Sequence, residues 1–216
     1  MISSSSANPL SVIIWGNYRL TILTSSCIRF EYNSKLFFED RPSRTFIHRN
    51  HPLPRFKKDM TIKYLKIETE KLKISLTDPR NPPKSTNFHI ESTSSEFTWD
   101  FSPPTQFLTI CDTSIGFTIF DDSHTPVLNK DGIYVVRTKC EMDFYFFGYG
   151  KSFIDGITDF FLISGSPELP PLYSFKISYT SKNISDAIKI YDSFTSRNIF
   201  FGSCFFDTFW HSQDRR

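Results

Sequence analysis

The chain has 216 residues, a net charge of only +2 and an aromatic content of 17%, including 24 Phe. Its length suffices for one large domain, or for one domain and part of another. The basic residues are scattered, whereas a nucleic-acid-binding protein usually concentrates them, so this class of protein is not expected. Because Phe favours strands, the composition predicts a β-rich core, with a sugar-binding surface as the alternative use of so many rings.

The sequence contains no recognisable motif for a metal, a cofactor or a membrane span. Cys27, Cys111, Cys140 and Cys204 are far apart and form no Cys-x-x-Cys pair, which argues against a zinc site. The first residues, M-I-S-S-S-S-A-N-P-L, carry no positive charge, and no apolar segment is long enough for a signal peptide or a membrane span. We therefore predict a reduced, cytoplasmic protein that binds no metal, cofactor, nucleic acid or membrane.

Short strands are predicted throughout residues 1–150. Residues 18–32 alternate around a pair of serines and predict a hairpin. In residues 65–69 and 72–76, apolar residues alternate with Lys, Glu and Ser, a pattern typical of antiparallel strands with one face in water. Roughly ten such strands, with no convincing helix among them, precede residue 150, so we predict a β-sandwich domain over residues 1–150.

The periodicity changes after Gly150. Apolar residues recur at i, i+1, i+4, i+7 and i+8 from Phe153, which places them on one face of a helix. Gly165 and Pro167 are expected to end this helix. We predict that residues 151–169 form a connecting helix.

Residues 170–216 predict a strand, a second helix and a second strand. Ser185 is a good N-cap for this helix, with Asp186 in its first turn, where the helix dipole favours negative charge. The apolar stripe that we expect the helix to bury consists of Ala187, Ile188, Tyr191 and Phe194. An almost unbroken apolar run at 199–206 follows, so the segment predicts a β-α-β unit with parallel strands.

Five motifs, in order and spacing, resemble glycoside hydrolase family 31, the α-glucosidase and α-xylosidase family. They are F-E-D-R-P-S at 38–43, F-D-D-S-H-T-P-V-L-N-K-D-G at 120–132, D-F-Y-F-F-G-Y-G-K-S-F at 143–153, D-F-F-L-I-S-G at 159–165 and F-F-D-T-F-W-H at 205–211. Together they extend over nearly the whole chain. The resemblance implies a mainly β protein with an N-terminal galactose-mutarotase-like β-sandwich, followed at 170–216 by the first βαβ part of a truncated catalytic (β/α)8 barrel.

The resemblance also implies carbohydrate metabolism, since the family consists of retaining α-glycosidases that use two carboxyl groups. The family's nucleophile lies in an Asp-Met-Asn-Glu-type run, which these residues do not contain, and the sequence ends before that strand would begin. At 176–181 the family tends to have Asn-Trp-Trp-Ser-Arg-Tyr, where this chain has K-I-S-Y-T-S. Asp207 corresponds to an Asp that holds sugar hydroxyls, and the second Asp of that run is replaced by Phe209. We predict no catalytic residue and two substrate-binding residues, Asp207 and Trp210.

Each of these assignments has a plainer alternative. Asp207 can instead accept hydrogen bonds from amides at its strand end, and Trp210 can be a packing residue. The acidic pairs Glu39-Asp40 and Asp121-Asp122 fall in predicted loops and are assigned to turns rather than to catalysis.

The function has alternatives as well. The first interpretation is a truncated family 31 relative, inactive by itself (a pseudoenzyme), with weak carbohydrate binding and with self-association through the exposed incomplete barrel. The alternatives are a carbohydrate- or partner-binding module that reuses the sandwich, and a fragment of a complete α-glycosidase. Whether the protein is an enzyme is therefore left open.

Overall fold

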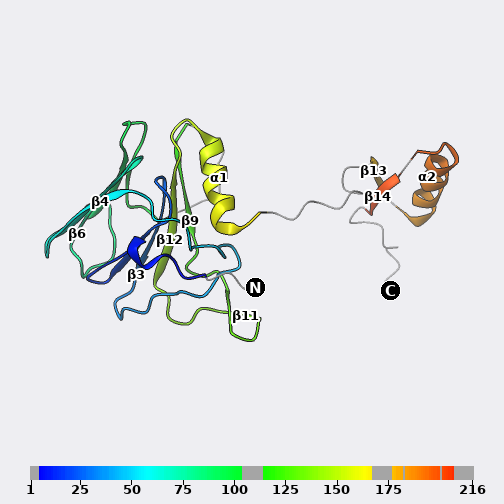
Figure 1. The fold of residues 1–216 in the computed structure, drawn as a ribbon. Helices are drawn as coiled ribbons and strands as arrows, with labels where there is room; N and C mark the ends of the chain where they lie inside the picture. Colours follow the sequence, from blue (N-terminus) through cyan, green and yellow to red (C-terminus); the bar gives the residue numbers. More distant parts are fainter. Residues whose placement is uncertain (1–4, 104–113, 167–176, 182, 200, 207–216) are drawn as a thin grey trace. The chain divides into compact units, whose positions relative to one another are not determined.

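The computed structural model describes residues 5–103, 114–166, 177–181, 183–199 and 201–206. The chain divides into two units, Met1–Ser166 and Pro167–Arg216, and Figure 1 labels several of their elements. Strands make up most of the regular structure, which confirms the predicted mainly β fold class. No helix of the described residues has both the length and the apolar character needed to cross a membrane.

The first unit contains two antiparallel sheets of five strands each. The first sheet, in the order β1-β2-β3-β12-β9, consists of β1 (Val12–Trp15), β2 (Tyr18–Ile22), β3 (Cys27–Tyr32), β12 (Met142–Gly148) and β9 (Phe117–Asp121). The second, in the order β4-β5-β6-β7-β8, consists of β4 (Phe56–Met60), β5 (Tyr64–Thr69), β6 (Leu72–Thr77), β7 (Phe88–Ser92) and β8 (Thr98–Asp100). The hairpin predicted for residues 18–32 is confirmed as β2 and β3.

Two further strands form a small ribbon, β10 (Val127–Leu128) and β11 (Tyr134–Val135). A short 3-10 turn, Pro9–Ser11, precedes β1. The described part of the chain therefore holds twelve strands before residue 150, where the sequence predicts roughly ten. The ribbon strands have two residues each, which is too short for an alternating pattern to reveal them.

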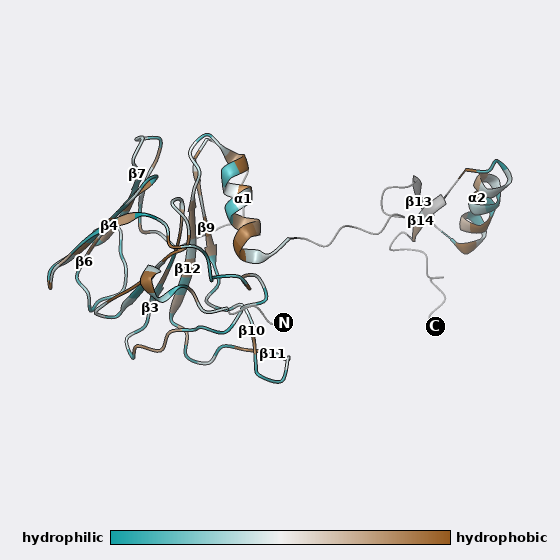
Figure 2. Cartoon of the chain, in the orientation of Figure 1, coloured by the Kyte–Doolittle hydropathy of each residue, from teal (hydrophilic) through white to brown (hydrophobic). Residues whose placement is uncertain are grey.

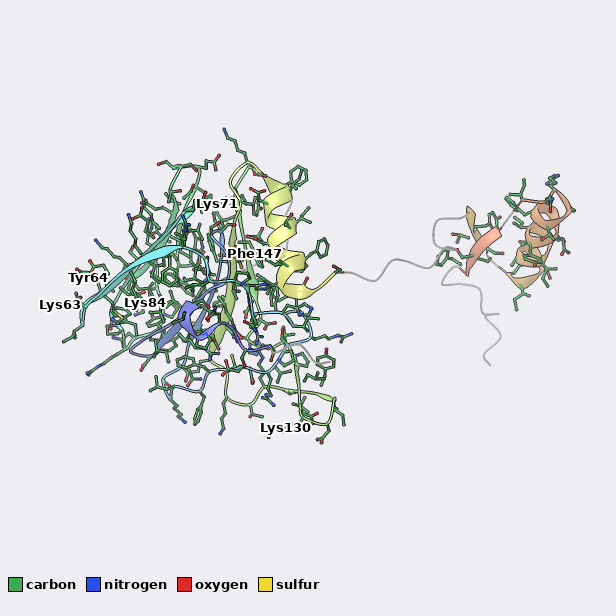
Figure 3. The ribbon with its side chains drawn as sticks, viewed as in Figure 1. Lys63, Tyr64, Lys71, Lys84, Lys130 and Phe147 are labelled. Carbon is green, nitrogen blue, oxygen red and sulfur yellow. The ribbon has the colours of Figure 1, made fainter. Side chains whose placement is uncertain are left out.

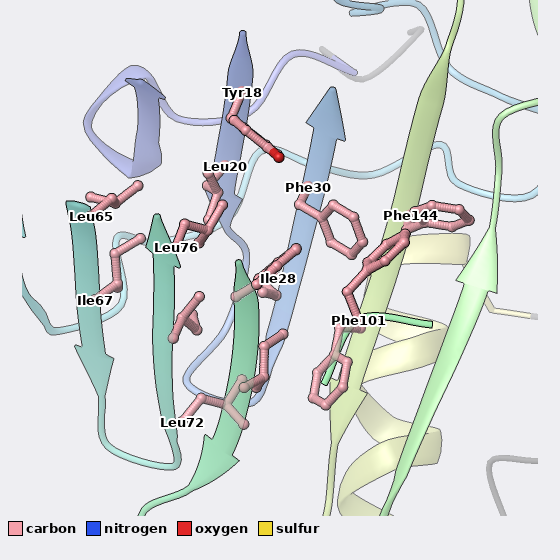
Figure 4. Close-up of a cluster of buried hydrophobic side chains, with 14 of the residues drawn as sticks. Tyr18, Leu20, Ile28, Phe30, Leu65, Ile67, Leu72, Leu76, Phe101 and Phe144 are labelled. Atoms are coloured by element: carbon pink, nitrogen blue, oxygen red, sulfur yellow. The ribbon is translucent and has the colours of Figure 1, made fainter. Parts of the chain in front are cut away.

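The core lies between the two sheets and is rich in aromatic rings (Figure 4). In β5 and β6 the buried and exposed side chains alternate, as the sequence predicts. The ring of Phe30, on β3, lies 4.7 Å from that of Phe88 and 5.1 Å from that of Phe144, so it joins rings of both sheets. Such centroid distances are typical of favourable edge and offset contacts.

The outer faces of the two sheets differ. All residues of β2 and β3 are buried on both faces, although their alternating sequence is typical of a strand with one wet face. On the second sheet a row of alternating charge crosses four strands, because Lys57 lies opposite Glu68, Glu68 opposite Lys73, and Lys73 opposite Glu91. The Lys73 ammonium lies 3.4 Å from the Glu91 carboxylate. This second face is therefore polar and open to water.

The helix predicted after Gly150 is confirmed as α1 (Phe153–Ser164), which ends at the C-cap Gly165. Its buried residues are Gly156 and Ile163, and the ring of Phe160 lies 5.9 Å from that of Phe46. Asp159 accepts hydrogen bonds from the hydroxyls of Thr24 and Ser26 at 2.8 and 2.6 Å. Figure 2 shows apolar colour along α1, and Ile154 of this helix is 63% exposed. The face of α1 that packs on the sandwich therefore differs from the apolar face predicted from the sequence, which included Ile154.

The second unit contains β13 (Ile177–Ser181), α2 (Ile184–Ser196) and β14 (Phe201–Phe206), and its two strands are parallel. This confirms the predicted β-α-β succession. The predicted N-cap, Ser185, is wrong: Asn183 caps α2, and its side-chain oxygen accepts a hydrogen bond from the Asp186 amide at 2.9 Å. Asn183 ranks with Ser as a capping residue and follows β13 more directly.

The apolar stripe predicted to be buried on α2 is not buried within this unit. Ile188 is 55% exposed and Tyr191 is 53% exposed. A helix at this position needs a packing surface larger than the described strand pair for its stripe to be covered.

We expect trypsin to digest the second unit before it cuts the sandwich. Of the side chains that the structure describes in this unit, only Ser181 is buried, so local opening costs little free energy. Lys189, on α2, and Arg197, the residue that caps its end, are exposed cleavage sites. Mass spectrometry of a digestion time course should find early cuts after residue 150 and a persistent sandwich fragment. A monodisperse monomer protected through Arg216 would contradict this expectation.

Candidate functional site

The two predicted substrate-binding residues, Asp207 and Trp210, lie outside the described residues. The strand that precedes them in the sequence, β14, ends at Phe206, which lies opposite Ser181 at the end of the parallel β13. The carboxyl ends of the two strands therefore meet at one edge, the arrangement that holds substrates in α/β barrels. The Ser181 hydroxyl donates to the Asn183 carbonyl oxygen at 2.7 Å, so it serves the turn into α2.

A buried ionic network on the outer face of the first sheet was not predicted. Arg29 donates from Nε and Nη2 to the two carboxylate oxygens of Asp143, both at 2.7 Å. Arg137 donates to the same Asp143 and, at 2.6 Å, to Asp122. The side chains of Arg29, Arg137, Asp122 and Asp143 are at most 2% exposed. These are paired charges of the kind that a protein interior tolerates.

The same network fastens the segment 39–49 to the sheet. Arg19 pairs with Glu31 in two hydrogen bonds and also donates to the Glu39 carbonyl oxygen at 2.9 Å. Arg29 donates to that same carbonyl at 2.8 Å, and Arg49 donates to the Tyr145 hydroxyl at 2.7 Å. These contacts explain why β2 and β3 are buried on both faces, since the segment covers them.

The assignment of the acidic pairs to turns is correct for one residue and wrong for another. Asp121 accepts a hydrogen bond from the Ser123 amide at 2.9 Å, which is turn chemistry. Asp122, its neighbour, is fully buried and ion-paired with Arg137. The partner is 15 residues away in the sequence, so the loop pattern gives no sign of it.

The network sets the pKa values of its two carboxyl groups in opposite directions. Burial and the charge of Asp143 raise the pKa of Asp122 to about 6, against the attraction of Arg137 and Arg29. Burial also opposes ionisation of Asp143, but the charge and hydrogen bonds of Arg29, together with Arg137 and Arg49, hold its pKa well below the usual range. Because these carboxylates are buried and held by guanidinium groups, the network anchors the fold and offers no accessible nucleophile.

The Asp122→Asn variant is expected to lose part of the pH dependence of stability between about pH 4 and 6. The raised pKa means that the fold favours neutral Asp122, so its ionisation destabilises the native protein as the pH rises through this window. Asn is neutral throughout. The stability of the native chain relative to the variant should therefore fall by about 1–3 kcal/mol from pH 4.5 to 7. Urea denaturation at both pH values measures this difference.

The matched control is Asp121→Asn, the same substitution at the neighbouring exposed residue. The free energy of unfolding of this variant should change with pH in the same way as that of the native chain. Parallel curves for Asp122→Asn would show that this carboxyl is not raised in the folded protein.

A cavity of about 580 Å³ opens at one end of the sandwich, beside the first turn of α1. Three separate segments line it: the β5–β6 turn at 70–71, the β7–β8 loop at 92–97, and residues 148–155 from β12 into α1. We call this cavity the end pocket. All of its lining residues belong to the first unit. Its volume lies within the range of ligand-binding pockets.

The fold defines a class of protein in which a two-sheet β-sandwich is followed by a helix and a parallel β-α-β unit. No family model and no curated protein matches the sequence. Two solved structures of the GH31 dextranase FjDex31A from Flavobacterium johnsoniae, a mutant complexed with isomaltotriose and the protein complexed with glucose, match with a TM-score of 0.55 at 14% identity. Each match covers 91% of this chain and 32% of the other, so the chain has a GH31-like fold and spans about a third of the solved structures' length.

Proposed function

We propose that this chain is a relative of the family 31 α-glycosidases and has no glycosidase activity by itself. The GH31-like fold, matched over 91% of the chain, is the observation that carries the relationship. Inactivity rests on the sequence, which contains no Asp-Met-Asn-Glu-type run. The five motifs that resemble family 31 support the same assignment.

The buried carboxyl groups do not supply the missing chemistry. Retaining hydrolysis needs two carboxyl groups about 5–5.5 Å apart across an accessible glycosidic bond. Asp122 and Asp143 are 0% exposed at their side chains and are held by Arg137. Their perturbed pKa values therefore come from burial and from the neighbouring charges of the network.

The purified 216-residue chain is expected to show no turnover of aryl α-glucosides or aryl α-xylosides. Loss of the catalytic groups of an enzyme typically lowers the rate by several orders of magnitude. A sensitive fluorogenic assay should therefore give the same signal for the chain and for its Asp207→Ala variant. Turnover that survives rigorous purification and disappears in Asp207→Ala would contradict the proposal.

The two predicted substrate-binding residues, which follow β14 in the sequence, have a weaker role in this proposal. Asp207 and Trp210 hold sugar hydroxyls and a sugar face with at best millimolar affinity, worth only ~4 kcal/mol. The sequence K-I-S-Y-T-S at 176–181 supports this limit, because it lacks the two tryptophans that the family tends to have there. The exposed Ile188 and Tyr191 of α2 support self-association through the second unit.

One observation favours a second candidate function, a carbohydrate-binding module that reuses the sandwich. The described residues that line the end pocket all belong to the first unit. Micromolar binding of an α-glucoside by the chain would favour this alternative over an inactive relative.

A further inference from the structure

We propose that the β4–β5 hairpin, together with the edge of β1 beside it, docks on the surface of an anionic lipid bilayer. The sequence predicts no membrane partner because it contains no spanning segment, but a protein that lies on a bilayer needs none. An exposed apolar cluster at the hairpin tip, a rigid backbone beneath it and an excess of positive charge support this docking. It goes beyond the proposed function, since neither the glycosidase relationship nor the second unit enters it.

The tip of the hairpin presents an isoleucine to solvent. Thr61, Ile62 and Lys63 join β4 to β5, and the Ile62 side chain is 90% exposed. Figure 3 labels Lys63 and Tyr64 at this end of the hairpin. Gly, Pro, Asn, Asp and Ser ordinarily occupy such turns because their backbones or side chains favour them, and Ile has neither advantage. The local fold therefore does not account for Ile at this position.

Ile62 belongs to a cluster of exposed apolar side chains. A cavity of about 500 Å³ is lined by Ile14 of β1 and by Met60 and Ile62 of the hairpin, and all three side chains are exposed. Single exposed apolar residues are common on protein surfaces, whereas adjoining ones mark sites that contact another protein or a membrane. The cluster is therefore an interaction surface.

Hydrogen bonds hold the backbone beneath this cluster. The Trp15 indole Nε1 donates to the Thr61 carbonyl oxygen at 2.7 Å, which ties the hairpin tip to β1. The Thr61 amide donates to the Tyr64 carbonyl oxygen at 2.8 Å and closes the turn. On the opposite wall of the cavity, the Asn17 amide donates to the Pro79 carbonyl oxygen at 2.7 Å. The tip is thus already ordered, so docking would require little further ordering of the backbone.

Positive charge is concentrated on the same hairpin. Residues 55–69 contain five basic and two acidic residues, a net charge of +3, whereas the whole chain carries +2. The basic residues are Arg55, Lys57, Lys58, Lys63 and Lys66. The two acids are matched across the strands, because Asp59 lies opposite Lys66 and Glu68 lies opposite Lys57. The other three cations form no ion pair with a described carboxylate, so they can attract anionic headgroups.

This combination favours a bilayer over a nucleic acid or a second copy of the chain. Nucleic acids are held by phosphate contacts and by stacking on aromatic rings, neither of which an exposed Ile provides. Pairing of β4 with the β4 of a second copy is opposed by Lys58, which lies opposite the buried Ile67 on the apolar face of this edge strand. A bilayer accepts both features, because aliphatic side chains enter below the headgroups while lysines extend to the phosphates.

The test is cosedimentation of the full 216-residue chain with vesicles of phosphatidylcholine and phosphatidylserine in a ratio of roughly 7:3, and with vesicles of phosphatidylcholine alone. We expect saturable binding to the mixed vesicles that weakens without phosphatidylserine and at high salt. Ile62→Ser should lower the affinity about tenfold, because it removes the apolar group that enters the bilayer. Lys58→Gln and Lys63→Gln should each lower it about fivefold. All three positions are exposed, so the fold should be retained.

The turn between β10 and β11 supplies the matched controls. Ile133 is exposed there, and the charges of Lys130 and Asp131 cancel. Ile133→Ser and Lys130→Gln should therefore change the vesicle affinity less than about twofold. Hydrogen exchange with bound vesicles should slow in residues 56–66 and not in α2, which separates this surface from the second unit.

Four outcomes would overturn the proposal. The first is the absence of binding to the mixed vesicles at about 1 mM accessible lipid. The second is an Ile62→Ser variant that binds them as tightly as the native chain, because charge alone would then attract them. The third is an equal loss of affinity in Ile133→Ser. The fourth is tighter binding of single-stranded RNA than of the vesicles, which would identify the hairpin as a nucleic-acid surface.

Discussion

Replacing Asp143 by Ala is expected to lower the free energy of unfolding by about 3–5 kcal/mol. Asp143 is 0% exposed and receives hydrogen bonds from both Arg29 and Arg137. Its removal would leave the two buried guanidinium groups without the anion that they share, so that Arg29 would pair only with Glu31 and Arg137 only with Asp122. Removing one partner from a buried ion pair or network is strongly destabilising. Urea denaturation followed by tryptophan fluorescence measures the change. The segment at 39–49 should also become protease-sensitive, since Arg29 holds the Glu39 carbonyl.

An exposed ion pair in the same segment provides the control. Arg41 pairs with Glu39 at 2.7 Å, and its side chain is 45% exposed. Arg41→Gln should cost less than about 1 kcal/mol, because exposed pairs contribute little. Equal losses for the two variants would show that the network does not anchor the fold.

Truncating Phe30 to Ala should destabilise the sandwich by about 3–5 kcal/mol. Phe30 is fully buried on the first sheet and contacts rings from the second sheet, among them Phe88 at 4.7 Å and Trp99 at 6.3 Å. Ala would open a cavity between the sheets that neighbouring rigid rings cannot fill. Thermal and urea unfolding should both report the loss.

The Phe37→Ala variant tests whether the loss of stability in Phe30→Ala comes from the burial of the ring. Phe37 is 49% exposed and lies on the surface with the Lys139 ammonium 4.4 Å from its ring centroid. The same truncation there should cost less than about 1 kcal/mol. If Phe30→Ala were no more harmful than Phe37→Ala, the ring cluster would not be the stabilising core.

The parts of the fold set by local pattern could be predicted from the sequence. The alternation in β5 and β6 and the helical spacing of α1 appear in short windows, and each window is confirmed. The burial of Arg29 could not be predicted, because its partner Asp143 is 114 residues away and its cover comes from a separate loop. Charged residues on alternate positions of a strand ordinarily face water.

For the candidate sites too, some residues could be predicted from local sequence and others could not. Asp207 and Trp210 were predicted from a motif resemblance, lie outside the described residues and remain predictions. The end pocket leaves no local signal, because its walls come from residues 70–71, 92–97 and 148–155. The sequence Gly148-Tyr149-Gly150 is the local feature that points to this region, because two glycines in or next to a strand often mark a place where another group lies close to the backbone. The side chains that approach them, Phe97 at Gly148 and Glu96 at Gly150, are visible only in the structure.

The row of alternating charge on the second sheet also decides which alignments of its strands are allowed. A slip of one residue is barred by the apolar face, but a slip of two keeps that face inward. With Lys57 opposite Glu68 and Asp59 opposite Lys66, a slip of two residues one way sets Lys57 against Lys66. A slip the other way sets Asp59 against Glu68. Like charges directly opposite each other are destabilising. The charges on the exposed face therefore favour the observed register of β4 and β5 over either slipped register.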